Sequence, residues 1–142
     1  MGIMNKSNLV IPVFAVALMA TSALAVDAPS DAKIRHDLIG SWIVTADSND
    51  RTPETDRMQE IFKADGTYTL LMFSDPECRV VAQRFEIGWK VQDHVLISRG
   101  PDGNSVADDV VSIGDGKMTL RSLDDGTTYT RVRKDSCAAG HH

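Results

Sequence analysis

Histidine has the widest chemistry of the residue types in this chain, because a neutral imidazole can bind a metal ion or act as a base near neutral pH. The four histidines are His36, His94, His141 and His142. Only the last two are close in sequence, and adjacent imidazoles lack the spacing that lets two side chains on a regular element share a metal ion. We therefore expect no metal site and no cofactor.

Acidic residues gather at three places where carboxylates would be close enough to act together. Asp47, Asn49 and Asp50 offer oxygen ligands for calcium, but the segment lacks the glycine and the distal glutamate of an EF-hand loop, so a solvated turn is favoured. The neighbours at 108–109 point to opposite faces of a strand, and those at 124–125 fall in a turn. Neither pair predicts a carboxylate dyad.

Nucleophilic catalysis would need a serine, threonine or cysteine beside a base that is itself oriented. The sequence contains no Gly-x-Ser-x-Gly turn, and in the central part of the chain only His36 and His94 are available as bases. The sequence therefore predicts a protein that is not an enzyme.

Two cysteines, Cys78 and Cys137, are present, and they lack the Cys-x-x-Cys spacing of a redox pair. In an oxidising compartment a lone pair of cysteines usually forms one disulfide, which is favoured here over two free thiols. The closed loop would hold about 60 residues, for which the chain-entropy model gives about 4 kcal/mol of stabilisation.

The N-terminal segment has the order of a secretory signal peptide. A polar start precedes an apolar run at residues 9–20, and Ala23 and Ala25 supply the small residues of a cleavage site. An uncleaved membrane anchor is the alternative, but the run is shorter than the roughly 20 residues that a spanning helix needs. We expect removal of residues 1–25, leaving residues 26–142 as one secreted or periplasmic domain without membrane insertion.

The chain is acidic, with 15 Lys and Arg against 20 Asp and Glu and a net charge of −5. Removal of the leader takes away only one charge, that of Lys6. Nucleic acids and anionic membrane surfaces both require a basic face on their partner, so we expect neither as a partner.

Alternation of apolar and polar residues with period two dominates the rest of the chain and predicts an all-β fold. One short helix is expected first, at residues 30–39, with Ser30 or Asp31 as N-cap and Gly40 as its stop. Eight strands are expected at residues 41–46, 57–63, 67–73, 79–91, 95–98, 106–113, 117–123 and 127–133. Eight antiparallel strands in an up-and-down meander are about the number that closes into a small barrel.

This pattern resembles the small secreted bacterial lipocalin-like domains. The residues that carry the resemblance are Gly40 and Trp42, which form a Gly-x-Trp motif after the helix, and Arg131 or Arg133 in the last strand. The resemblance implies that Trp42 packs across the closed end of the barrel and that one of the two arginines lies against its ring. The expected disulfide also resembles a common lipocalin arrangement.

The alternation of the strands predicts a protein that binds a small hydrophobic or amphipathic ligand inside the barrel. Inward-facing aromatic and Met side chains would line the cavity, with an Arg or a Tyr as polar anchor. The residues expected at the ligand are Tyr68, Met72, Phe85, Trp89, Tyr129 and Arg131. The alternative is a filled barrel that binds a protein partner, for example as an inhibitor of a secreted hydrolase, through a loop at 47–55 or 100–105.

Overall fold

The computed structural model describes residues 2, 12, 15, 28–100 and 102–139, and it contains a closed barrel of eight antiparallel strands preceded by one short helix. Each strand pairs with the next in sequence, and β1 pairs with β8. The elements are α1 (Asp31–Leu38), β1 (Gly40–Val44), η1 (Thr55–Arg57), β2 (Met58–Phe62), β3 (Thr67–Phe73), β4 (Val81–Gln92), β5 (Val95–Arg99), β6 (Ser105–Gly114), β7 (Lys117–Ser122), β8 (Thr128–Arg133) and η2 (Cys137–Ala139). The all-β, up-and-down barrel predicted from the sequence is confirmed.

The expected signal peptide and the terminal pair of histidines lie almost entirely outside the described residues, so both stay predictions. Within the described part of the chain, no helix combines the length and the apolar character needed to cross a bilayer.

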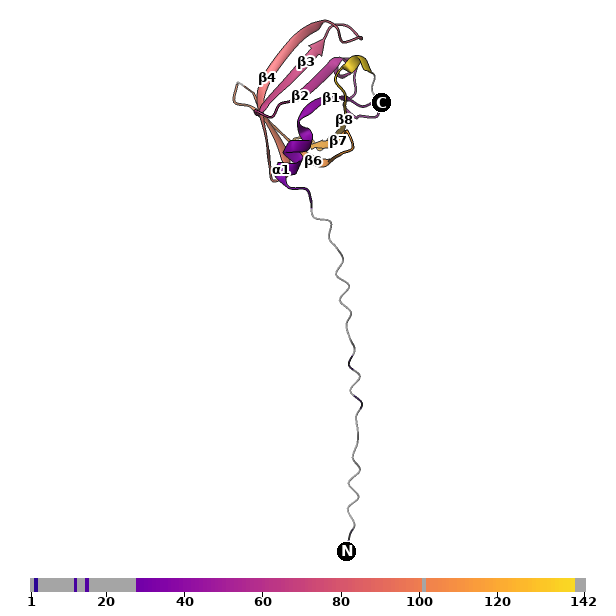
Figure 1. Cartoon of the computed structure of the whole chain (residues 1–142), viewed down its shortest axis with the longest axis vertical. Coiled ribbons are helices and arrows are strands. Elements are labelled where there is room, and N and C mark those ends of the chain that lie inside the picture. The colour runs from indigo at the N-terminus through magenta and orange to yellow at the C-terminus, as the bar shows by residue number, and fades with distance from the viewer. Residues whose placement is uncertain (1, 3–11, 13–14, 16–27, 101, 140–142) are drawn as a thin grey trace.

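The barrel has two unlike ends (Figure 1). We call the end covered by α1 the helix end; the turns at 63–66, 93–94 and 114–116 lie there. We call the opposite end the open end; it carries the connections at 45–57, 74–80, 100–104 and 123–127. In Figure 1, α1 lies at the lower end of the barrel, and β3 and β4 reach its upper end.

Helix α1 is fastened to the barrel by its cap, its buried face and its first carboxylate. Ser30 is the N-cap and accepts a hydrogen bond from a first-turn N–H at 3.2 Å. Ile34 and Leu38 are buried in the barrel core, and this packing holds the helix against the end of the barrel. The Asp31 carboxylate accepts both backbone N–H groups of the turn at 93–94, at 2.8 and 2.9 Å.

Contacts at the helix end show which of the two arginines of the last strand lies against Trp42. Arg133 lies over Trp42, with 4.4 Å between the guanidinium carbon and the ring centroid. It also donates hydrogen bonds to two carbonyl oxygens at the end of α1, at 2.7 and 2.5 Å. Gly40 has a φ of +137°, and a Cβ there would collide with the Arg133 guanidinium. Arg133 therefore takes the place beside Trp42, and Arg131 is free for another role.

Aromatic side chains fill the half of the barrel next to α1. The Phe62 ring lies 4.9 Å from Tyr68 and 5.2 Å from Trp89, the latter edge to face. The Trp89 indole donates to the Lys63 carbonyl at 3.0 Å, and the Arg35 guanidinium lies 4.5 Å over its ring. Each large side chain buried here contributes about 1.5–3 kcal/mol. The fully packed residues of this half are Ile34, Leu38, Trp42, Phe62, Trp89 and Met118.

A second apolar cluster lies on the outer face of the barrel, because Ile43 points away from the interior that its neighbour Trp42 faces. Cys78 and Cys137 pack against Ile43. The two cysteines lie at disulfide distance, with their Cα atoms 5.9 Å apart, which confirms the predicted pairing. The pair ties η2 to the β3–β4 connection.

Candidate functional site

The half of the barrel away from α1 contains a cavity of about 270 Å³. The alternation of the strands places one side chain in every two towards it, as in any small barrel. Unlike the helix half, this half has ionisable side chains at several of those positions. The ionisable lining consists of Asp50, Glu60, Tyr68, Asp108, Tyr129 and Arg131.

Arg131 is the centre of this polar lining and is only 4% exposed. Its Nη1 and Nη2 atoms donate to the two carboxylate oxygens of Asp50, at 3.0 and 2.6 Å, and its Nε donates to Glu60 at 2.5 Å. Burial disfavours the charged form, but the two carboxylates outweigh it and raise the pKa of Arg131 above its ordinary value. The guanidinium is therefore charged and already engaged with two anions.

Asp50 reaches Arg131 from the β1–β2 connection. The Ser48 hydroxyl donates to Asp50 at 2.5 Å and accepts the backbone N–H of Thr130 at 2.9 Å. Burial raises the pKa of Asp50, but the hydrogen bonds from Arg131 and Ser48 more than compensate, and the pKa lies below its ordinary value. The expectation of a solvated turn is therefore wrong for Asp50, because this carboxylate pairs with a buried cation.

Tyr68 holds the other side of the network in place. Its hydroxyl donates to Glu60 at 2.7 Å, so the Glu60 carboxylate accepts hydrogen bonds from both Tyr68 and Arg131. Burial and the negative charge of Glu60 raise the pKa of Tyr68 well above its ordinary value. The Tyr68 hydroxyl therefore stays protonated and acts as a donor at any physiological pH.

Asp108 differs from the other two carboxylates. It is 6% exposed, yet within the described residues no Lys, Arg or His side chain forms an ion pair with it. Burial raises the pKa of Asp108 by more than its interaction with the Tyr129 hydroxyl lowers it. The neighbouring Asp109 points to the outer face and pairs with Arg121 at 2.6 Å, as the strand alternation predicts.

Apolar side chains complete the lining and continue to the open end. Val106 belongs to the cavity and is 56% exposed, so it stands at the mouth. Phe85 on β4 and Leu123 in the β7–β8 connection are also large, exposed apolar residues towards this end. The mouth is therefore suited to admit a molecule with an apolar part. The apolar lining residues are Phe62, Ile87, Leu96, Val106 and Leu120.

The structure brings together half of the residues expected at the ligand. Those in the cavity lining are Tyr68, Tyr129 and Arg131. Trp89 instead packs in the helix half, where Phe62 separates it from the cavity. Met72 and Phe85 occupy the inward faces of β3 and β4 nearer the open end and do not line this cavity.

Reasoning from the sequence missed the carboxylates of the site. Glu60 alternates with Met58 and Phe62, so the sequence indicates that this acidic side chain points into the barrel. Asp108 carries the same signal, since it follows the inward Val106 by two residues. Asp50 carries no such signal, because the sequence does not say which strand a loop residue meets.

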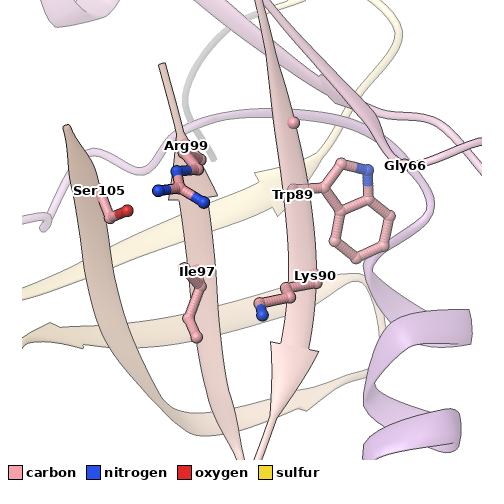
Figure 2. A pocket seen from close by; sticks show the side chains of 7 residues that line it. Gly66, Trp89, Lys90, Ile97, Arg99 and Ser105 are labelled. Carbon is pink, nitrogen blue, oxygen red and sulfur yellow. The ribbon is translucent and has the colours of Figure 1, made fainter. Parts of the chain in front are cut away.

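A second depression, of about 360 Å³, lies over β4 and β5. Figure 2 shows Lys90, Ile97 and Arg99 extending from these strands, whereas the Trp89 ring turns towards Gly66 and α1. Lys90 and Arg99 are exposed, so the depression is part of the outer surface. The cavity inside the barrel, with its buried and fixed polar groups, is the stronger candidate site.

Across residues 28–100 and 102–139, no three His, Cys, Asp or Glu side chains are placed to share a metal ion. Comparison of the chain with protein-family models, with curated proteins and with solved structures found no match. What the protein does is therefore inferred from the geometry of the cavity.

Proposed function

We propose that this protein is a lipocalin-like binding protein that takes a small amphipathic molecule into the open half of its barrel. The observation that carries the proposal is the division of the interior: one half is packed with aromatic side chains, and the other leaves about 270 Å³ between apolar and ionisable groups. Small-molecule sites combine apolar side chains with fixed polar groups, and this cavity has both, with an unusually large share of ionisable residues. Its volume lies just below the roughly 300–1,000 Å³ of pockets for drug-sized ligands, which favours a smaller ligand.

The lipocalin-like assignment is supported by the arrangement at the helix end. Gly40, Trp42 and Arg133 adopt the relation that the family resemblance implies, with the guanidinium on the indole and no room for a side chain at position 40. These residues support a fold and say little about a ligand, because function resides in the site and not in the barrel.

Binding is also favoured by the pre-formed state of the polar lining. Arg131 donates hydrogen bonds to Asp50 and Glu60, and the Tyr68 hydroxyl donates to Glu60, so these three side chains are fixed. A ligand that enters therefore meets oriented groups and loses little free energy in ordering them. We place this activity outside the cytoplasm, in the periplasm or the extracellular space, because the Cys78–Cys137 pair is typical of an oxidising compartment.

Protein binding is a second candidate function, favoured by exposed apolar residues before and in the first half of β4. Val80, Val81 and Phe85 are 58%, 48% and 47% exposed. The loop at 47–55 is a weaker candidate for a partner, because Asp50 within it is held by Arg131.

Native mass spectrometry of the gently purified protein tests the binding function. We expect a retained small molecule that is lost on denaturation. Val106→Trp would place an indole at the mouth and is expected to abolish retention. Val111→Trp is the matched control, because Val111 lies on the same strand, is 51% exposed and does not line the cavity.

A bare mass for the wild-type protein, together with failure to bind any member of an amphipathic series added in solution, would refute the proposal. Equal retention by the two tryptophan variants would place the ligand outside the barrel and refute it as well.

A further inference from the structure

The charges that line the cavity do not balance. Asp50, Glu60 and Asp108 are three carboxylates, and Arg131 is the one positively charged side chain among the described lining residues. Arg131 is engaged by two of the three carboxylates. The interior is therefore electronegative when Asp108 is ionised.

This imbalance argues against an anionic ligand. A carboxylate or phosphate group would have to compete with Asp50 for both Nη atoms of Arg131 and with Glu60 for its Nε atom. It would also lie near the negative charge of Asp108, at a cost of several kcal/mol for like charges in a poorly solvated site. Arg131 therefore orients the network and is not the anchor of the ligand.

Asp108 is the lining carboxylate that forms no ion pair with a described side chain, and Arg131 acts on it only from a longer distance. Its neighbour on the same strand shows the contrast, because Asp109 has Arg121 at 2.6 Å on the outer face. Burying a carboxylate without a counter-ion is costly, and proteins normally pair such a group or exclude it. A positively charged group on the ligand would remove this cost. A neutral hydrogen-bond donor on the ligand would remove only part of it.

We propose that the ligand of the barrel carries an organic cation, such as an alkylammonium group, whose counter-ion is Asp108 and whose apolar part lies against Leu96, Val106 and Leu120. The inference rests on the proposed binding function and adds the chemical class of the ligand. Tyr129 extends the site, because it interacts with Asp108 and its ring lies 5.0 Å from the Arg131 guanidinium. Glu60 adds a second negative charge close to Asp108.

A matched series of probes separates this inference from the binding function itself. Hexylammonium, 1-hexanol and hexanoate have the same six-carbon chain and differ in the charge of the polar end. Each is titrated into the purified protein at pH 8 by isothermal calorimetry, where an alkylammonium is charged because its pKa resembles that of Lys, about 10.4. We expect hexylammonium to bind at least about tenfold more tightly than 1-hexanol, as one charge-assisted hydrogen bond allows, and hexanoate to bind most weakly.

Two variants assign the preference to Asp108. Asp108→Asn keeps the size and shape of the side chain and is expected to reduce the affinity for hexylammonium about tenfold while leaving 1-hexanol unchanged. Asp109→Asn changes the adjacent residue on the outer face and is expected to leave all three affinities unchanged.

The wild-type protein supplies a test that needs no variant. The groups that act on Asp108 are Tyr129 and Arg131 on β8, Glu60 on β2 and Asp124 in the β7–β8 connection. Affinity for hexylammonium is expected to fall as acid protonates Asp108, whereas affinity for 1-hexanol is expected to stay constant over the same range.

The outcomes are distinct. If 1-hexanol or hexanoate binds as tightly as hexylammonium, the cavity binds ligands but the cation inference is wrong. If Asp108→Asn and Asp109→Asn have the same affinity for hexylammonium, Asp108 is not the counter-ion. If no probe binds, the binding function and the inference fail together.

Discussion

Replacing Arg131 with Met removes the cation of the interior network while keeping a side chain of similar length. Asp50 then loses two hydrogen bonds from the guanidinium and Glu60 loses one, and both carboxylates stay in a poorly solvated interior. Removing one partner of a buried ion pair costs about 3–5 kcal/mol, because the remaining charge is uncompensated. Against a total stability of about 5–15 kcal/mol for a small domain, this loss is severe.

The pH dependence of that loss follows from Asp50. Its pKa in the folded protein is below the ordinary value, so Asp50 contributes stability above its unfolded pKa of about 3.9 and loses that contribution as pH falls through the folded value. Without Arg131, burial raises the pKa of Asp50 against only the hydrogen bonds from Ser48 and from the Asp50 backbone, so the pKa is higher than in the wild-type protein. The difference in unfolding free energy between wild type and Arg131→Met is therefore largest near pH 7 and shrinks in acid.

Urea denaturation, followed by the fluorescence of the buried Trp42 and Trp89, measures these differences at several pH values. Arg121→Met is the matched control, because Arg121 forms an ion pair with Asp109 on the exposed face. Exposed pairs contribute less than about 1 kcal/mol, so this variant is expected to stay close to wild type. The reasoning would be refuted if Arg131→Met and Arg121→Met lost equal stability at pH 7, or if the loss for Arg131→Met grew in acid.

Three further predictions concern stability. Gly40→Ala is expected to cost about 1–3 kcal/mol, because a side chain at a φ of +137° is strained and collides with Arg133; Gly126→Ala, at a φ of +75° with open space around it, should cost less in the same urea titration. Replacing both Cys78 and Cys137 with Ser is expected to lower the unfolding free energy by about 4 kcal/mol, from the chain-entropy cost of opening a loop of 59 residues; an unchanged denaturation midpoint would contradict it. Asp108→Asn is expected to raise the melting temperature at pH 7, because the raised pKa of Asp108 means that ionisation destabilises the folded state; the gain should vanish at a pH where Asp108 is protonated in both the folded and unfolded states. A melting temperature that is lower than wild type at pH 7 would argue against it.

The barrel could be predicted from the sequence because its determinants are local. Period-two alternation and the glycine-containing turns fix strands and hairpins within a few residues of each other, and every strand pairs with its neighbour in the chain. The Gly-x-Trp motif was informative for the same reason, since Gly40 and Trp42 belong to one short segment. Alternation does not decide which of Arg131 and Arg133 lies against Trp42, because both lie on the inward face of β8.

The polar site was harder to predict because it is built from contacts between distant segments. Asp50, Glu60 and Arg131 meet from a loop, β2 and β8, and the bond between Arg131 and Asp50 joins residues 81 positions apart. Shared inward faces predict that the aromatic residues form one ligand site, but Trp89 lies too far towards the helix end. Alternation tells which face a residue occupies, and it does not tell how far along the barrel axis that residue lies.

The packed half of the interior supplies the stability that the polar half of the interior lowers. Trp42, Phe62 and Trp89 bury large apolar surfaces at the helix end, which supplies stability that a domain of this size needs. That stability allows the open half to keep an electronegative cavity, including an Asp108 carboxylate whose burial outweighs the stabilising effects of Tyr129 and Arg131. A barrel selected for stability alone would place an apolar residue at position 108, as it does at the inward Val106 and Val110 on the same strand. If Asp108 serves the proposed cation site, Asp108→Asn is expected to gain stability and to lose affinity for a cation in the same variant.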